Sequence, residues 1–361
     1  MPPGSDLPLV LHVTAPKLVN QAEKISARLP RFFEGRQKIS LCLTLLFSIG
    51  LCAISEAQAP EHVWPSKTYY RYKEVLGRKI FFREAGSSNQ TTILLLHGYP
   101  SSSHTYRELI PLLSGRYHVI APDHIGSGLS DKPEPDEFEY SFDNLATYVD
   151  GLLKELNVDD FVIYMQDFGA PVGFRVIMME PKRIRAIIAQ NANAYLEGIP
   201  LEKQKFFNEA QTDQSPENIK KLFDFTSEEA IRNLQYLRDV KDDTEVMSPD
   251  AWIHDGFFLS TEKERRIQVE LFQDYKTNLD RYPEWQFFLR NQRIPLLITW
   301  GANDPVFTSR GAEAYLKDVP KAELHLLDAG HFAVEEKAVE IAKLITSFLG
   351  DEGRSGSIEK Q

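Results

Sequence analysis

Asp167 lies between a predicted strand and a predicted helix, where a side chain can do chemistry. The run at 161–166 is apolar and rich in β-branched and aromatic residues, which predicts a buried strand, and the periodic residues from Gly169 onward predict a helix. A functional side chain at such a sharp turn, with a small residue two positions later, is typical of a nucleophile elbow. The first N–H groups of the helix favour its ionised form. The simpler alternative is that Asp167 only caps that helix.

Two other residues with catalytic potential follow later strands. Asp304 comes after a predicted strand at 294–300, and His331 comes after one at 322–327. Ligand-handling groups of open parallel sheets collect at the carboxyl ends of the strands, so we expect both side chains near Asp167. A histidine held by an acid can act as a general base. Each also has a simpler interpretation, because Asp304 precedes a proline and suits an ordinary turn, while His331 follows a glycine and suits a helix cap.

The elements that must position these residues alternate between strands and helices. Apolar runs bounded by turn residues predict strands at 69–75, 79–83, 91–96, 118–121, 161–166, 184–189, 294–300 and 322–327. Helices are predicted at 104–113 and after Ser141, which is interpreted as an N-cap. This alternation predicts an α/β fold, with a mostly parallel sheet and helices on both faces.

Residues 191–293 interrupt the alternation. They are polar, helix-favouring and dotted with aromatic residues, and they contain no run that resembles a buried parallel strand. We therefore expect a helical cap inserted between two parts of one core, at 60–190 and 294–350. The polar residues 351–361 are predicted to form a disordered tail.

Residues 1–59 are interpreted as a leader. Residues 39–54 carry no charge, follow three basic residues in 31–38, and precede the small-residue site at 57–59. An apolar run shorter than the ~20 residues that a spanning helix needs, with these flanks, predicts a secretory signal and a secreted or periplasmic protein. The long segment before the run and Pro60 after the site leave an uncleaved membrane anchor as the alternative.

The composition narrows the classes of partner. The net charge of the 361 residues is −11 and no basic patch stands out, so nucleic acid is not expected as a partner. Cys42 and Cys52 both fall in the leader, which leaves the rest of the chain without thiol chemistry, disulfides or cysteine metal sites. We expect no cofactor and no metal, and a small molecule as the partner; the sequence does not predict the oligomeric state.

From about Tyr69 to Leu349 the chain resembles the α/β-hydrolase fold, in particular its branch of epoxide hydrolases and haloalkane dehalogenases. Five matching pieces occur in the correct order, namely the HGxP loop at 97–100, the G-x-small-x-Ser loop at 126–130, the elbow at Asp167, the acid Asp304 and the late His331. With all five present, the nucleophile interpretation of Asp167 is strongly favoured over the helix cap.

An aspartate nucleophile suits a different reaction from that of a serine. Its carboxylate is ionised at neutral pH and needs no base to attack a saturated carbon, so it would form an ester with the substrate. Water activated by His331 would then cleave that ester, with Asp304 holding the imidazole ring. The backbone N–H groups of Tyr99 and Phe168 would form the oxyanion hole, in which each donor contributes ~3 to 4 kcal/mol.

Four nearby residues are interpreted as non-catalytic. His97 is expected to shape its loop, and Asp123 to be a structural turn partner. Asn191 and Asn193 follow the strand at 184–189, where some dehalogenases keep their acid, but neither side chain is ionisable.

The leaving group is inferred from aromatic residues. The resemblance implies that dehalogenases hold halide with a Trp directly after the nucleophile, whereas this chain has Phe168 there and Tyr99 in the HGxP loop. Epoxide hydrolases instead protonate the opening oxygen with cap tyrosines. The segment from Tyr275 to Asn278 is similar to the family's second such site, but the earlier position offers only Phe206 and Phe207.

The candidates for substrate binding or proton donation are therefore Tyr275, Tyr195 and Trp285, among cap aromatics that also include Tyr236, Tyr282 and Trp252. Trp252 and Trp285 are alternatively halide donors or, as we favour, core aromatics of the cap. Epoxide hydrolysis of a neutral, apolar substrate is the favoured function. The alternatives are haloalkane dehalogenation and a ligand-binding member without catalysis.

Overall fold

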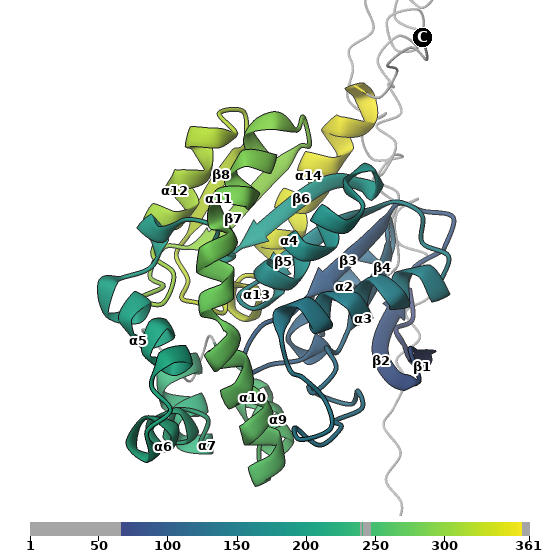
Figure 1. Ribbon diagram of the computed structural model, residues 1–361. Coiled ribbons are helices and arrows are strands. Elements are labelled where there is room, and N and C mark those ends of the chain that lie inside the picture. The colour runs from purple at the N-terminus through teal and green to yellow at the C-terminus, as the bar shows by residue number, and fades with distance from the viewer. Residues whose placement is uncertain (1–65, 239, 241–246, 356–361) are drawn as a thin grey trace, which may run out of the picture. The chain divides into compact units, whose positions relative to one another are not determined.

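The computed structural model describes residues 66–355 with the exception of 239 and 241–246 (Figure 1). Its centre is an eight-stranded sheet in the order β1-β2-β4-β3-β5-β6-β7-β8. The strands are β1 (Tyr69–Val75), β2 (Arg78–Ala85), β3 (Thr92–Leu96), β4 (His118–Pro122), β5 (Phe161–Gln166), β6 (Ile184–Gln190), β7 (Leu296–Gly301) and β8 (Glu323–Leu327). β1 and β2 pair antiparallel with their neighbours and all other pairs are parallel. The α/β class predicted from the alternation of elements is confirmed.

The central strands are buried on both faces. Every residue of β3 and β5 is buried, as expected for near-continuous apolar runs in a parallel sheet. Their side chains alternate between two hydrophobic clusters. Each fully buried aliphatic residue contributes about 1.5 to 3 kcal/mol, which makes these strands a rigid support for the loops that follow them.

Helices cover both faces of the sheet (Figure 1). One cluster holds α3 (Phe142–Glu155), α4 (Gly169–Met179) and α12 (Ser309–Asp318), and the other holds α2 (Leu109–Leu113), α13 (Ala333–Glu336) and α14 (Ala338–Ser355). The α3 helix begins as predicted, because the Ser141 hydroxyl oxygen accepts a hydrogen bond from the Asn144 N–H.

The single helix predicted at 104–113 is wrong. The structure has a short 3₁₀ helix η1 (Ser103–Tyr106) followed by α2. Pro111 has no N–H to donate to the carbonyl of Arg107, so a continuous α-helix loses a bond where the two pieces separate.

Between β6 and β7 the described residues form helices and no strand, and we call residues 191–293 the helical insertion. It contains η3 (Leu196–Gly198), α5 (Leu201–Thr212), α6 (Pro216–Phe225), α7 (Glu228–Ala230), the π-helix η4 (Ile231–Tyr236), α9 (Pro249–Phe258), α10 (Glu262–Asp274) and α11 (Lys276–Asn291). In Figure 1, α5, α6, α7, α9 and α10 lie together at one end of the sheet. The insertion leaves the sheet at the carboxyl end of β6, which is the end where ligands bind in such folds.

The predictions for the chain ends have different outcomes. α14 continues to Ser355, so the predicted disordered tail at 351–361 begins too early; its last turns extend a long amphipathic helix. The leader at 1–59 lies outside the described residues, and so do residues 356–361. Within 66–355, apart from the omitted positions, no helix combines the length and the apolar character needed to span a bilayer.

Candidate active site

Asp167 occupies a strained turn between β5 and α4. Its φ is +50°, in the left-handed region that a non-glycine residue rarely adopts. The turn is tight because a Cβ at Gly169 would lie 2.1 Å from the Leu96 carbonyl oxygen, and a Cβ at Gly98 would lie 2.3 Å from the Asp167 Cβ. Glycine at both positions lets the HGxP loop pass directly over the elbow.

The structure brings Asp167, Asp304 and His331 together. His331 Nδ1 lies 2.7 Å from Asp304 Oδ2, and His331 Nε2 lies 3.4 Å from Asp167 Oδ2. Each residue follows a different strand, β5, β7 or β8, and all three are at most 5% exposed. The imidazole thus bridges two carboxylates at the carboxyl edge of the sheet, in the geometry of a nucleophile, base and acid triad.

Asp304 is held by donors on both oxygens. Its Oδ1 accepts hydrogen bonds from the backbone N–H groups of Val306 and Phe307, at 2.7 and 3.1 Å. Its Oδ2 accepts one from the Asn191 side-chain amide at 2.7 Å, besides facing the imidazole. These contacts fix the orientation of the Asp304 carboxyl group, so its Oδ2 is held facing His331 Nδ1.

Asn191 is a positioning residue that the sequence analysis did not assign. Its Oδ1 accepts hydrogen bonds from the Gly301 N–H at 2.9 Å and from the Gln190 amide, which turns its own N–H group toward Asp304. Its backbone has φ +44°, a conformation that Asn tolerates better than most residues. The sequence signal that could have identified Asn191 is its position directly after a core strand, together with a side chain that can both donate and accept hydrogen bonds.

The pKa of His331 reflects its two acidic neighbours. Burial lowers the pKa, but the charges of Asp304 and Asp167 and the hydrogen bonds to them outweigh burial and raise it to about 10. At neutral pH the resting site therefore holds an imidazolium between two carboxylates.

The HGxP loop places one donor of the predicted oxyanion hole. The Tyr99 N–H donates to Asp167 Oδ1 at 2.7 Å, which leaves Oδ2 as the oxygen beside His331. Phe168 directly follows Asp167 and precedes the first residue of α4. The Gly98 N–H donates to the Gln166 side chain at 3.1 Å, which fixes the loop to the end of β5.

His97 and Asp123 have structural contacts, in agreement with their interpretation. His97 Nε2 accepts a hydrogen bond from the His124 N–H at 3.0 Å. The two oxygens of Asp123 accept from the N–H groups of Ser103 and Leu129, both at 2.8 Å. Both side chains therefore tie together the loops around the site.

Aromatic side chains of the helical insertion face the nucleophile loop. The Phe272 ring packs against Tyr99 and Phe168, with ring centroids 4.7 and 5.4 Å apart. Phe168 also lies 5.4 Å from Tyr275, which stacks on Phe207 at 3.8 Å. Neither Phe168 nor Tyr99 offers a side-chain N–H, so the residues beside Asp167 form an apolar wall.

Two tyrosines lie together near this wall. Tyr275 immediately precedes α11 and Tyr282 is seven residues further on, so two helical turns bring the hydroxyl groups to the same side, where they hydrogen-bond each other. Burial, and more weakly the charge of Asp167, raises the pKa of both phenols. The Asn193 side-chain amide donates to the Tyr282 oxygen at 3.2 Å. Both phenols are protonated donors over the whole physiological pH range.

Tyr282 was named in the sequence analysis only among several cap aromatics, and its seven-residue spacing from Tyr275 was the pattern that distinguished it. Tyr195 and Trp285, by contrast, do not take the predicted positions. The Tyr195 hydroxyl donates to Asp318 Oδ2 at 2.8 Å, so it is not available to a substrate. The Trp285 ring stacks on Phe174 of α4 at 4.8 Å, in the packing between helices. Both positions are corrected to structural ones, because each side chain is used to attach the insertion to the core.

Comparison with known proteins places this site in a family. The sequence model of the alpha/beta hydrolase fold matches residues 91–338. The chain belongs to the α/β-hydrolase family. This α/β-hydrolase is 41% identical over 281 residues to an uncharacterized hydrolase of Saccharomyces cerevisiae, covering 76% of this chain and 94% of the yeast protein. It is 24% identical to a cis-3-alkyl-4-alkyloxetan-2-one decarboxylase of Shewanella oneidensis, over 76% of this chain and 86% of that protein.

Solved structures with the same fold include members of both branches named by the resemblance. A haloalkane dehalogenase from Bradyrhizobium elkani superposes on the α/β-hydrolase with a TM-score of 0.65 and 20% identity, over 80% of this chain and all of that one. The epoxide hydrolase CorEH gives a TM-score of 0.63 and 20% identity, over 79% of this chain and 100% of that one. The protein is thus a hydrolase of this fold, similar in sequence to haloalkane dehalogenases and in fold to an epoxide hydrolase.

Proposed function

We propose that this hydrolase opens epoxides through a covalent ester on Asp167. The observation that carries the proposal is the pair of phenols, Tyr275 and Tyr282, beside an aspartate elbow backed by histidine. When a carboxylate attacks an epoxide carbon, the oxygen that departs remains on the substrate and needs a proton. A phenol O–H supplies one, whereas a halide needs none.

In the first step Asp167 Oδ2 forms a bond to a ring carbon while the carbon–oxygen bond breaks. The electron pair passes to the ring oxygen, which takes a proton from the tyrosine pair. The phenolate formed recovers a proton from His331. The products of this step are a hydroxyalkyl ester on Asp167 and a neutral imidazole.

Loss of charge at Asp167 explains why the base becomes active at the right moment. In the resting site two carboxylates raise the pKa of His331 to about 10. The ester removes one of these charges, so the pKa of the imidazole falls and its proton is released. Asp304 and Asn191 hold the ring in place throughout.

In the second step the neutral His331 takes a proton from water as the oxygen of that water attacks the ester carbon. The Tyr99 N–H already contacts Asp167 Oδ1, the oxygen that becomes the oxyanion. Collapse of the tetrahedral intermediate releases the alkoxide, which takes the remaining proton of the Asp167 carboxyl group. The net reaction is epoxide plus water to diol, and the resting site is restored.

The deciding experiment incubates the purified full-length chain with an epoxide, a haloalkane and an alkyl β-lactone of matched chain length. The β-lactone is included because of the Shewanella relative. We expect diol as the product. Halide release without diol would favour the dehalogenase alternative, decarboxylation of the lactone alone would favour the chemistry named for that relative, and no turnover of any of them would favour a binding protein.

The covalent step has its own test. A His331→Gln variant should form the ester but cleave it slowly, because the base is missing. Intact-mass measurement should then show an adduct equal in mass to the epoxide. An Asp167→Ala variant is the matched control and should show none; an adduct on that variant would contradict the assignment of the nucleophile.

We also propose that the protein is exported with residues 1–59 as its leader. Sequencing of the amino terminus of the mature protein tests this. A mature protein that begins at Met1 would reject cleavage, and its recovery with membranes would then favour the anchor.

A further inference from the structure

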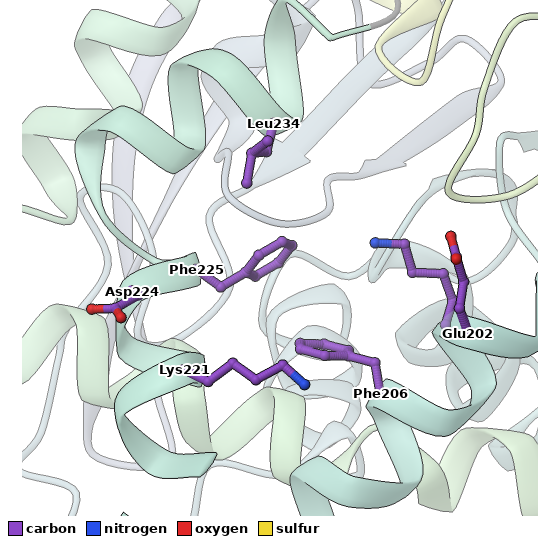
Figure 2. A pocket seen from close by; sticks show the side chains of 7 residues that line it. Glu202, Phe206, Lys221, Asp224, Phe225 and Leu234 are labelled. Atoms are coloured by element: carbon purple, nitrogen blue, oxygen red, sulfur yellow. The ribbon is translucent and has the colours of Figure 1, made fainter. Parts of the chain in front are cut away.

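A pocket lies within the helical insertion, outside the apolar wall. Its volume is about 430 Å³, and it is lined by Glu202, Lys203, Phe206, Lys221, Asp224, Phe225 and Leu234 (Figure 2). We call it the outer pocket. Its residues come from α5, α6 and the π-helix η4.

The interior of the outer pocket is apolar. The rings of Phe206 and Phe225 pack against each other with centroids 5.4 Å apart, and Figure 2 shows Leu234 on the opposite side of Phe225 from Phe206. The Asp224 side chain points away from the rings and pairs with Lys220 at 2.6 Å. An alkyl chain can therefore lie against the two rings without meeting that carboxylate.

Two lysines and two acidic residues line the outer pocket, and both ammonium groups lie against its rings. The Lys203 ammonium lies 5.9 Å from the centroid of the Phe225 ring, and the Lys221 ammonium lies 5.5 Å from that of Phe206. Within the described part of the chain, no carboxylate comes within 4.0 Å of the Lys203 ammonium, and Lys221 has only Glu209 at 3.7 Å. Burial, then the positive charge of Arg238, lowers the pKa of Lys203, and the negative charge of Glu202 offsets this only in part.

The outer pocket shares its inner wall with the nucleophile. Phe225 stacks on Tyr99 at 6.1 Å, and its carbonyl accepts a hydrogen bond from the Tyr99 hydroxyl at 3.1 Å. The N–H of the same Tyr99 donates to Asp167. Phe206 and Phe225 both contact Phe272, at 5.9 and 5.4 Å, and Phe272 packs on Phe168. A ligand in the pocket is thus separated from the reacting atoms by a single layer of rings.

We propose that the outer pocket binds the carboxylate of an amphipathic substrate, with Lys203 as the main contact and Lys221 as the second. The alkyl chain of that substrate runs along Phe206 and Phe225, and its reactive end reaches Asp167 by passing between the rings that separate the pocket from the nucleophile. The orientation of the chain rests on the proposed function, since it places the reactive group at Asp167. The carboxylate site itself depends only on the pocket. It refines the expectation of a neutral substrate, because the reacting end is uncharged and apolar while the far end is anionic.

Binding of an unreactive probe tests the carboxylate site independently of catalysis. The probes are laurate and methyl laurate, which share an alkyl chain and differ in charge, and calorimetry measures their dissociation constants with the full-length chain. We expect laurate to bind more tightly than the ester. The Lys203→Ala substitution should raise the dissociation constant of laurate about tenfold and that of the ester less than twofold. Lys203→Arg should restore most of the affinity.

Lys205→Ala is the matched control, because Lys205 is on the same helix, is 74% exposed and pairs with Glu209. Its laurate affinity should equal that of the wild type. Equal affinity of laurate for the wild type and Lys203→Ala, or an equal loss in Lys205→Ala, would overturn the proposal. A loss confined to Lys203→Ala that shrinks as salt is raised would support it.

Turnover separates this inference from the proposed function. The substrates are epoxidised oleic acid and its methyl ester, and the measured quantity is the ratio of their kcat/KM values in the wild type and in Lys203→Ala. A ratio that falls about tenfold in the variant supports the proposed orientation. An unchanged ratio with both substrates converted overturns the orientation alone, whereas no diol from either substrate, with laurate binding intact, rejects the epoxide chemistry and leaves the carboxylate site standing.

Discussion

The triad and the outer pocket are two regions of one molecule that handle charge differently. At the triad, each charged group meets an opposite charge or an aligned donor at 2.7 to 3.4 Å, and the three side chains are buried. At the outer pocket, Lys203 has no close carboxylate and the interior consists of rings and aliphatic groups. The charged groups at the sheet edge are therefore paired with one another in the absence of a substrate. In the pocket, the Lys203 ammonium has no carboxylate within ion-pair distance among the described residues and can pair with an anionic ligand. We therefore assign chemistry to the first region and selectivity to the second.

The largest expected effect on activity comes from a substitution in the triad. Asp167→Ala removes the carboxylate that forms the ester in the proposed mechanism, so turnover should fall by roughly 10⁴-fold or more. Diol formation by the purified variant measures it. Retention of more than about one hundredth of the wild-type activity would mean that Asp167 is not the nucleophile.

The next effect concerns the two tyrosines near Asp167. Tyr275→Phe and Tyr282→Phe each remove one hydroxyl group of the donor pair, and kcat for epoxides should fall about 10²-fold in each. Tyr195→Phe is the matched control, because its hydroxyl is bonded to Asp318. Its kcat should stay within about twofold of the wild type. If all three variants behave alike, the hydroxyl pair has no special role in proton donation.

A smaller effect is expected at Asn191, which acts through Asp304. Asn191→Asp keeps the shape but replaces the N–H donor with a second carboxylate beside Asp304, which weakens the hold on the ring and adds negative charge near His331. We expect kcat to fall about tenfold and the alkaline rise of kcat to move to higher pH, because the added charge raises the pKa of the base.

Asn157→Asp is the control for that variant, since Asn157 is another left-handed position, with φ +54°, at the end of α3. Its kcat and pH profile should match the wild type. A lower kcat in Asn191→Asp without any shift of the profile would indicate a role in folding alone.

The last prediction concerns stability rather than rate, and it follows from the raised pKa of His331. The folded value is about 10 and the unfolded value is about 6.5, so the folded state binds the proton more tightly. The resulting stabilisation is complete below about pH 6.5 and is lost as the pH rises toward 10. The free energy of unfolding of wild type minus that of His331→Gln should therefore decrease by an amount on the order of a few kcal/mol over this range. Urea unfolding of both proteins at several pH values measures the difference, and a constant difference would contradict the imidazolium assignment.

The sequence by itself determined the α/β class, the strand order along the chain and the identity of Asp167, Asp304 and His331 as candidates. These depend on local patterns, since strands buried on both faces are continuous apolar runs and the residues after them lie at one edge of the sheet. Even so, local pattern failed where a single proline divides the helix at 104–113 and where α14 extends beyond residue 350.

Only the tertiary structure decided which residues of the helical insertion serve the site. Tyr282 and Tyr195 have the same side chain, yet the Tyr282 hydroxyl hydrogen-bonds with Tyr275 and the Tyr195 hydroxyl donates to Asp318. Asn191 is turned toward Asp304 by the Gly301 N–H, which belongs to the neighbouring strand but is over one hundred residues away in the chain. Lys203 and Lys221 share a pocket because α5 packs beside α6. The physical reason is the same in each case: the partner of a polar side chain is chosen by how the helices pack against the sheet and each other, and no local periodicity encodes that packing.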